Sequence, residues 1–204
     1  RESGRTVRLD AILAAGKKDA ASRVYAENQA KMCEDLAIEY HLHELSDTPT
    51  FDDIARCIRA RNEDPDVHAI MLHLPLPAGI DTYRAQSLID PEKDVEGVNP
   101  ANIGNIVYGR SSLAPCTALA AIRMVEHTRI DLKGKIAVCV GASNIVGKPV
   151  AVMLMRKEAT VISCNEHTPD ITDLTRRADV LITAAGVPGL VKADWVKPGA
   201  IVID

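Results

Sequence analysis

Short apolar runs alternate along the chain with longer stretches in which apolar residues recur every three or four positions. The short runs have the composition and length of buried strands, at 7–14, 40–45, 67–74, 136–140, 159–164, 180–184 and 200–204. The longer stretches predict helices at 19–38, 50–61, 85–89, 117–127, 145–157 and 171–177. Because strands and helices alternate throughout, the pattern predicts an α/β fold with largely parallel sheets.

Local signals refine this prediction. In the helix at 19–38, an apolar stripe is expected to face the core, formed by Val24, Tyr25, Met32 and Leu36. The helix at 50–61 is preceded by two possible N-cap residues, Thr48 and Thr50. Residues 90–115 are rich in Pro, Gly and Asn and predict a long connecting segment, which is usually functional or a domain junction.

Composition narrows the class of protein. The 204 residues are 47% hydrophobic but only 3% aromatic, so a sizeable, mainly aliphatic core is expected. The net charge of −4 gives no electrostatic reason to expect nucleic acid or an anionic membrane as a partner. No apolar run reaches the roughly 18 residues of a membrane-spanning helix, and no signal peptide is visible. The chain starts without Met and stops inside a predicted strand, so we expect it to be part of a longer protein.

The cysteines give no sign of a metal site or a disulfide framework. They are odd in number, scattered and without C-x-x-C spacing: Cys33, Cys57, Cys116, Cys139 and Cys164. We therefore expect reduced thiols, several of them buried as small hydrophobic residues, and no bound metal. A reducing compartment, by default the cytoplasm, is the expected location.

A glycine-containing turn follows the predicted strand at 136–140. The run from Gly141 to Gly147 precedes a predicted helix, and strand, glycine turn and helix together are the layout of a dinucleotide-binding crossover. The spacing is G-x5-G and not G-x-G-x-x-G, so by this pattern alone an ordinary tight turn is an equal alternative.

Six segments in order resemble the methylenetetrahydrofolate dehydrogenase/cyclohydrolase family. They are S-R-V-Y with the following K at 22–31, L-P-L-P at 74–77, P-E-K-D-V-E-G at 91–97, P-C-T at 115–117, I-V-G-K-P at 145–149 and V-K-P-G-A at 196–200. The resemblance spans residues 20–204. It implies an N-terminal α/β folate-binding domain, residues 1–116, and a Rossmann-type domain with a doubly wound parallel sheet, residues 117–204.

The resemblance also implies an activity and an assembly. Family members oxidise 5,10-methylenetetrahydrofolate by hydride transfer to a nicotinamide cofactor, and many then hydrolyse the methenyl product. The two domains of the family face each other across the folate and cofactor cleft. A homodimer formed through the Rossmann domains is implied as well.

Three positions depart from the family pattern in the expected folate site. The family's catalytic Lys is replaced by Gln29, its Gln by His73, and its Asp by Glu96. Gln29 shares a helix face with Tyr25, whereas Lys31 lies roughly 200° further round and is not expected to replace the missing Lys. The resemblance therefore predicts four catalytic positions and three flanking substrate contacts: Tyr25, Gln29, His73 and Glu96, with Leu72, Leu74 and Pro75.

The departures separate the two reactions of the family. Hydride transfer depends mainly on positioning, whereas hydrolysis of the methenyl product needs a titratable group. Since Gln29 cannot titrate, we expect dehydrogenase activity with cyclohydrolase activity lost or weak, as in the monofunctional branch of the family. Without the motif, His73 would be taken as a packed core residue and Glu96 as a solvated acid. His73 acting as a weak base that restores hydrolysis is a further alternative.

The expected cofactor is NAD in preference to NADP. Ala142 stands where the family has an Arg that pairs with the 2′-phosphate, and Glu166 stands where it has a Ser. A carboxylate there repels a phosphate and accepts hydrogen bonds from ribose hydroxyls, although Glu166 could also be an ordinary solvent-facing acid. The expected cofactor contacts are Gly141, Ala142, Ser143, Ile145, Val146, Gly147, Glu166, Thr168, Ala185 and Gly186.

Two other functions remain open at this point. The substituted positions could mark a folate- or nucleotide-binding paralogue without turnover, identified by binding without NADH formation. They could also mark a dehydrogenase of another one-carbon or pterin substrate, because His73 changes the hydrogen bonds that the pocket offers. Likewise, the small residues at 184–186 could serve only to form a turn.

Overall fold

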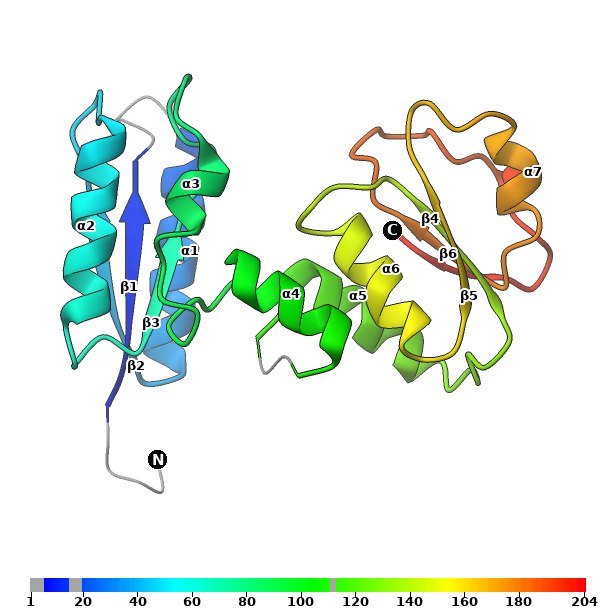
Figure 1. The fold of residues 1–204 in the computed structure, drawn as a ribbon, viewed down its shortest axis with the longest axis horizontal. Helices are drawn as coiled ribbons and strands as arrows, with labels where there is room; N and C mark the ends of the chain where they lie inside the picture. The colour runs from blue at the N-terminus through cyan, green and yellow to red at the C-terminus, as the bar shows by residue number, and fades with distance from the viewer. Residues whose placement is uncertain (1–5, 15–19, 111–112) are drawn as a thin grey trace. The chain divides into compact units, whose positions relative to one another are not determined.

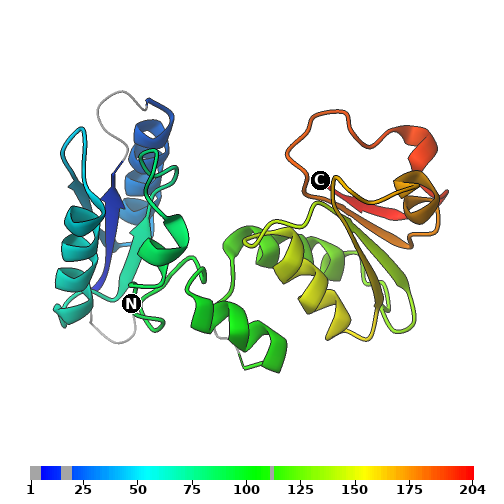
Figure 2. The same cartoon turned by 45° about the horizontal axis from the view of Figure 1, so that its top comes forward.

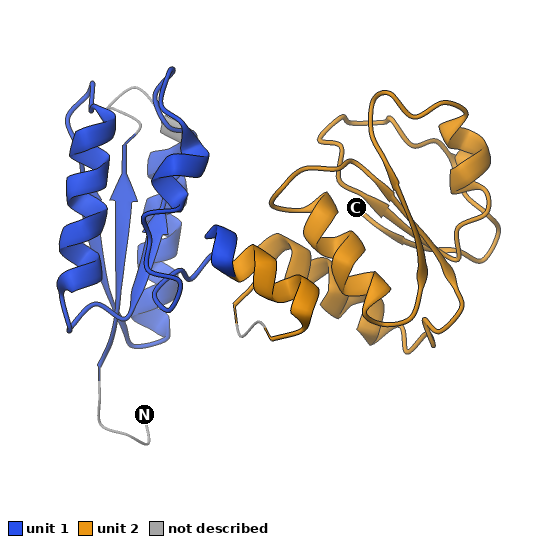
Figure 3. Ribbon diagram, viewed as in Figure 1, with its two compact units in different colours: residues 1–101 blue, residues 102–204 orange. Residues whose placement is uncertain are grey.

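The computed structural model describes residues 6–14, 20–110 and 113–204. The chain divides into two compact units, residues 1–101 and 102–204 (Figures 1 and 3). Among the described residues, no helix is long and apolar enough to cross a membrane.

The first unit contains a three-stranded parallel sheet in the order β2-β1-β3. The strands are β1 (Val7–Leu13), β2 (Ile38–Glu44) and β3 (Ala69–Leu72). The helices are α1 (Ala20–Asp35), α2 (Phe51–Glu63) and α3 (Thr82–Gln86). Alternate residues of β1 contribute to two separate cores: Ala11 packs near Cys33 of α1, and Ile12 packs with Ile54 of α2. The helices α1 and α2 therefore cover opposite faces of the sheet (Figure 2).

The second unit contains a four-stranded parallel sheet in the order β5-β4-β6-β7. Its strands are β4 (Ile136–Val140), β5 (Thr160–Cys164), β6 (Val180–Thr183) and β7 (Ile201–Ile203). Its helices are α5 (Cys116–His127), α6 (Gly147–Met155), α7 (Ile171–Thr175) and the short 3₁₀ helix η1 (Ala193–Trp195). Aliphatic residues of α5 and α6 pack on one face of this sheet, and Ile171 and Leu174 of α7 pack on the other. Both faces are thus covered, as parallel sheets require.

The predicted α/β fold with parallel sheets is confirmed, and all seven predicted strands are present, β4 with the predicted ends and the other six with shifted ends. One helix was missed: α4 (Pro100–Tyr108) lies inside the segment predicted as a connection, and it crosses the division between the two units. Pro100 occupies the first helical position, where a proline is favourable, and Ile106 anchors the helix in the core. The Pro and Asn content that indicated a loop therefore belongs partly to a helix start.

The predicted apolar stripe of α1 is wrong. Val24, Tyr25, Met32 and Leu36 are 54–63% exposed, and the residues that face the sheet are small ones such as Ala26 and Cys33. Small side chains let the helix lie close to the strands, so its larger apolar residues remain outside that contact. Asp19, where this helix was predicted to begin, lies outside the described residues.

A buried carboxylate lies at the centre of β1. Asp10 is completely buried, and its oxygens accept hydrogen bonds from Arg8 Nε at 2.7 Å and His43 Nε2 at 2.7 Å. Arg61 of α2 donates to His43 Nδ1 at 3.0 Å, which leaves the imidazole proton on Nε2, facing the carboxylate. Burial alone acts to raise the pKa of Asp10, but the hydrogen bonds from Arg8 and His43 outweigh it, and the pKa lies below the ordinary value.

The start of α2 is determined by Thr50. Its Oγ1 accepts a hydrogen bond from the Asp53 backbone N–H at 3.2 Å, and the Asp53 carboxylate accepts one from the Thr50 N–H at 3.0 Å. This reciprocal pair is a capping box, in which the helix satisfies two of its own free N–H groups. Thr50 is therefore the cap, and the alternative Thr48 is an exposed loop residue.

Replacing the cap should destabilise the protein more than the neighbouring substitution. We expect Thr50→Ala to lower the free energy of unfolding by about 1 kcal/mol, because the N-cap side chain is lost. The matched control Thr48→Ala should leave it within about 0.5 kcal/mol. Urea denaturation followed by circular dichroism measures both, and equal losses in the two variants would contradict the assignment.

Candidate active site

The first candidate site lies where β3 ends. The His73 N–H still donates to the Ile12 carbonyl at 2.9 Å, and the chain then leaves the sheet through a cis Leu74–Pro75 peptide. The Ser22 hydroxyl of α1 donates to the Leu74 carbonyl at 3.3 Å and ties the start of that helix to this turn. Side chains from α1 and from the end of β3 are thereby brought together.

His73 and Tyr25 form the centre of this arrangement. Their ring centroids are 5.7 Å apart and the rings are nearly perpendicular, an edge-to-face contact. His73 is 3% exposed, and burial lowers its pKa, so that the neutral imidazole is favoured. Its Nε2 has no hydrogen-bond partner among the described residues. A buried polar atom of this kind is available to a ligand or to water.

Gln29 lies one turn after Tyr25 on α1 and points toward the sheet. Its amide Nε2 donates to the Met71 sulfur at 2.6 Å, and its Oε1 is buried without a hydrogen-bond partner among the described residues. Lys31, by contrast, is exposed. On this helix the uncharged amide of Gln29 therefore faces β3, whereas the charge of Lys31 faces solvent.

Glu96 comes from a segment that runs beside β3. Asp94 forms a parallel bridge with Ile70, and the Ile70 N–H donates to the Lys93 carbonyl at 2.7 Å. The chain turns after this bridge, with the Gly97 N–H donating to the Asp94 carbonyl at 3.1 Å, and the partly exposed Glu96 lies in that turn. Burial, and to a lesser extent the negative charge of Asp94, raises the pKa of Glu96 to about 7. This carboxyl is thus balanced between its neutral and charged forms near physiological pH.

The three predicted substrate contacts beside His73 differ in how far their side chains are exposed to a ligand. Leu74 and Pro75 are exposed beside the site. Leu72 is 1% exposed, and its side chain packs in the core with Ile12 and Ile70, so only its backbone reaches this edge.

Tyr40 is a residue that the sequence analysis used only as the start of a strand. It packs beside Met71 under α1, and its buried hydroxyl has no hydrogen-bond partner among the described residues. Burial, with smaller contributions from Cys33 and Tyr25, raises the pKa of Tyr40 to about 12. The sequence did contain one indication that this residue is more than a strand residue. Tyr40 is an aromatic residue with a hydroxyl group, on a strand that a helix was predicted to cover.

The second candidate site lies at the carboxyl edge of the other sheet. From β4 the chain crosses to β5 on one side and then returns to β6 on the other side, so the strand order reverses at β4. Ligands of open α/β sheets bind outside the strand ends at such a reversal. The predicted cofactor residues follow those strands: Gly141 after β4, Glu166 after β5 and Gly186 after β6.

The spacing of the two glycines follows from close backbone contacts. Gly141 has φ +111°, and a Cβ atom there would collide with the carbonyl group of Ala184. A Cβ atom on Gly147 would collide with the carbonyl oxygen of Gly141. The turn after β4, residues 141–147, therefore packs against both the loop after β6 and the start of α6, and we call it the glycine cradle. A glycine-containing turn that leads into a helix N-terminus is a typical site for the phosphates of a dinucleotide.

The other predicted cofactor residues of this turn differ in their contacts and exposure. Ser143 Oγ accepts hydrogen bonds from the N–H groups of Val146 at 3.2 Å and Gly147 at 3.4 Å, and so caps α6. The Val146 side chain packs against the core, whereas Ile145 is 41% exposed. Ala142 is half-buried, within the glycine cradle.

The turn after β5 presents Glu166 to solvent. The Thr168 hydroxyl accepts a hydrogen bond from the Asn165 N–H at 2.9 Å, and the Asn165 side chain accepts one from the His167 N–H at 2.9 Å. Thr168 thus builds the turn, and the Glu166 side chain is 85% exposed, 3.5 Å from His167 Nε2. No cationic side chain pairs with Glu166 other than His167 among the described residues.

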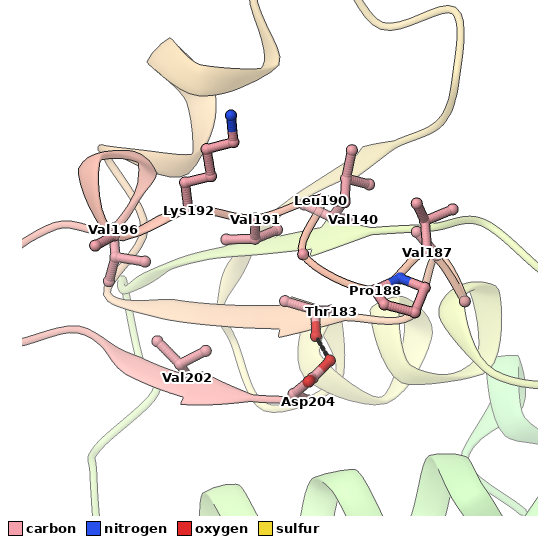
Figure 4. A pocket seen from close by; sticks show the side chains of 14 residues that line it. Val140, Thr183, Val187, Pro188, Leu190, Val191, Lys192, Val196, Val202 and Asp204 are labelled. Carbon is pink, nitrogen blue, oxygen red and sulfur yellow. Dashed lines mark hydrogen bonds between the residues drawn. The ribbon is translucent and has the colours of Figure 1, made fainter.

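A pocket of about 530 Å³ lies beside these strand ends (Figure 4). Its floor includes Val140, Thr183 and Val202, and the loop through Ala185 and Gly186 to Ala193 forms its wall. The Thr183 hydroxyl donates to the Asp204 carboxylate at the end of β7, whereas the Lys192 ammonium points away from the floor. Apolar walls with a few polar groups are typical of sites for small organic ligands, and the volume is sufficient for an aromatic ring of a dinucleotide.

Comparison with known proteins identifies the family. Residues 1–96 match the tetrahydrofolate dehydrogenase/cyclohydrolase catalytic domain, and residues 115–204 match the NAD(P)-binding domain of the same family. The chain belongs to the tetrahydrofolate dehydrogenase/cyclohydrolase family. The predicted family and the two-domain α/β architecture, with a Rossmann-like nucleotide-binding domain, are thereby confirmed.

Individual members of the tetrahydrofolate dehydrogenase/cyclohydrolase family are closely similar. The bifunctional protein FolD of Moorella thermoacetica is 44% identical over 187 residues, which cover 92% of this chain and 67% of the relative. The bifunctional enzyme FolD of Campylobacter jejuni has a crystal structure that matches all of this chain and 72% of its own, with a TM-score of 0.94 and 39% identity. A methylenetetrahydrofolate dehydrogenase of the silkworm Bombyx mori matches 98% of this chain and 73% of its own, with a TM-score of 0.91 and 34% identity.

The chain thus spans about two thirds of the length of the curated relatives that it matches. Within the described residues no group of three or more His, Cys, Asp or Glu side chains could hold a metal ion.

The raised pKa of Glu96 predicts how stability depends on pH. The folded protein holds the Glu96 proton up to about pH 7, whereas an unfolded glutamate releases it near 4.5, so this group stabilises the fold less as pH rises from 4.5 through 7. We expect Glu96→Gln to gain free energy of unfolding relative to the parent protein as pH rises between those values. Chemical denaturation at pH 5 and pH 8 measures the difference, with the exposed Glu158→Gln as control. A difference independent of pH would contradict the raised pKa.

Proposed function

We propose that this protein catalyses NAD-dependent oxidation of 5,10-methylenetetrahydrofolate to 5,10-methenyltetrahydrofolate, with cyclohydrolase activity lost or weak. The observation that carries the proposal is Gln29. Its neutral amide stands where the family resemblance places a catalytic Lys, and it is held toward the site by Met71.

The oxidation itself requires little of this chain beyond positioning. A nicotinamide cofactor, when bound, would supply the hydride acceptor, and the folate nitrogen next to the methylene carbon would supply the electron pair that leaves the product as a methenyl cation. Tyr25 and the neutral His73 would orient the reacting ring, and Gln29 Oε1 and His73 Nε2 offer it hydrogen-bonding atoms without a fixed positive charge. Glu96, able to lose its proton near pH 7, would anchor the pterin and accommodate the cationic product.

Hydrolysis of the methenyl product makes a different demand. A water molecule must be activated and a ring nitrogen protonated, and Gln29 can do neither. His73 is the alternative base, because its buried Nε2 is unpaired within the described chain. Relatives that carry the name bifunctional make retained hydrolysis the competing hypothesis for this chain.

The preference for NAD rests on two side chains. Ala142 supplies no cation in the glycine cradle, and the exposed Glu166 carboxylate at the end of β5 would repel a 2′-phosphate. The cradle between Gly141 and Gly147 serves either cofactor, so the discrimination lies at these two positions. By family resemblance, we also propose a homodimer and a cytoplasmic location.

The proposed reaction is tested by following reduced cofactor and methenyl absorbance together in the full-length protein. We expect NADH to form and methenyl product to accumulate. Gln29→Lys should accelerate methenyl hydrolysis by about 100-fold or more, since general acid–base groups contribute on that scale. The control Lys31→Gln removes an exposed lysine of the same helix and should change neither reaction.

Each outcome of this assay has a distinct meaning. Reduced cofactor without methenyl accumulation, above the buffer rate of hydrolysis, would show that His73 or another group retains cyclohydrolase activity. Binding of folate and NAD with no reduction would overturn the enzyme assignment in favour of a binding paralogue. No binding of the folate would indicate another substrate.

The cofactor preference is tested at Ala142. We expect Ala142→Arg to raise kcat/KM with NADP relative to NAD by about tenfold or more, the scale of one charge-assisted hydrogen bond. Ala120→Arg adds the same side chain at an exposed position on α5 and serves as control. An unchanged NADP/NAD ratio in Ala142→Arg would refute the role of this position.

A further inference from the structure

Lys93 makes an unusual set of contacts next to the folate site. Its ammonium group donates to three backbone carbonyls at the end of α2, those of Arg61 at 3.1 Å, Asn62 at 2.7 Å and Asp64 at 2.7 Å. A lysine has three N–H donors, so all of its hydrogen-bonding capacity is used on this helix end. The last carbonyls of a helix lack intrahelical partners and carry partial negative charge, which a cation stabilises.

The backbone of Lys93 is fixed on its other side by the sheet. Its carbonyl accepts the Ile70 N–H at 2.7 Å, at the place where Asp94 bridges to β3. The Asp94 carboxylate then accepts the Asn99 N–H at 2.7 Å. Lys93 is thus the residue through which α2 and β3 jointly hold the segment that leads to Glu96.

A second tie runs between the same two regions. The Asn62 side chain donates to the Leu88 carbonyl at 2.7 Å and accepts the Asp90 N–H at 3.0 Å. Asn62 therefore secures the chain before Lys93 to α2. Between Asp90 and Asp94 the Lys93 N–H closes a turn by donating to the Asp90 carbonyl at 2.9 Å, and the Lys93 side chain adds the contacts that fix this turn to the end of α2.

We propose that Lys93 is a positioning residue of the folate site, which acts by holding the segment that carries Glu96 against α2 and β3. The catalytic importance of Lys93 rests on the proposed function. The hydrogen bonds of Lys93 are independent of that function. Nothing in the arrangement requires Lys93 to touch the substrate, since its donors are all engaged by α2.

We call the three hydrogen bonds from Lys93 to the end of α2 the clamp. Its loss is expected to have a specific effect on Glu96. Burial, and to a lesser extent the charge of Asp94, raises the pKa of the Glu96 carboxyl to about 7, and both effects depend on where the segment lies. Without the Lys93 ammonium, the segment can move away from β3, and the carboxyl gains water. A substitution that only weakened α2 would lower stability without changing the environment of Glu96.

The test is the titration of Glu96 in the full chain, measured by ¹³C NMR of carboxyl-labelled glutamate. The Glu96 signal is identified by its disappearance in Glu96→Gln. In the parent protein the midpoint should lie near 7, and in Lys93→Met it should move toward 4.5. Lys133→Met removes a lysine that is paired with Glu158 in the other unit, and should leave the midpoint unchanged.

A second readout connects the clamp to the reaction. In Lys93→Met the KM for 5,10-methylenetetrahydrofolate should rise, and the pH profile of kcat/KM should shift to lower pH together with the Glu96 midpoint. Should Lys93→Met fail to fold, Lys93→Gln, which keeps an amide donor, is expected to move the midpoint in the same direction by a smaller amount.

The outcomes distinguish this inference from the proposed function. A folded Lys93 variant with an unmoved Glu96 midpoint would overturn the positioning role, whatever the activity. A moved midpoint in a protein that does not oxidise methylenetetrahydrofolate would support the clamp and refute the proposed reaction.

Discussion

Parallel strands that are covered on both faces impose one constraint on this chain: a ligand can reach them where they end, whereas polar groups inside the sheet, such as Asp10 with Arg8 and His43, must satisfy one another. Each strand crosses a core of aliphatic side chains, and each crossover returns the chain so that all carboxyl ends meet at one edge of the sheet. His73 after β3 and Gly141 after β4 both occupy such an edge. The candidate folate and cofactor residues are therefore gathered by the topology of the two units, although they are widely separated in sequence.

The two edges prepare a site in opposite ways. In the first unit, buried polar atoms of Gln29 and His73 are left without partners in the described chain. A ligand or water that satisfies them removes a desolvation cost. In the second unit, Gly141 and Gly147 let backbone pack directly against backbone next to the start of α6. One edge offers hydrogen-bonding atoms of side chains, and the other offers a turn that leads into a helix N-terminus.

Sequence reasoning succeeded where one local signal decides the outcome. Periodicity located the strands, and the six motifs located the family. It failed where packing decides. The contact face of α1 consists of small residues because the helix lies close to the sheet, and α4 begins at Pro100 in a segment whose composition indicated a loop. The contacts of the Lys93 side chain join segments that are distant in the sequence, which no local pattern reveals.

The charged cluster around Asp10 also limits how this chain can exchange parts with its relatives. The carboxylate is buried among Arg8, His43 and Arg61, which lie on two strands and one helix. Removing one partner of a buried ion pair leaves an uncompensated charge, so these positions can be replaced together far more easily than singly. In a chimaera made by recombination, a crossover point between residues 10 and 61 would separate the partners. Such a hybrid would combine Asp10 and Arg8 from one parent with Arg61 from the other. The buried charges would then be unbalanced, even where each residue is well paired in its own parent.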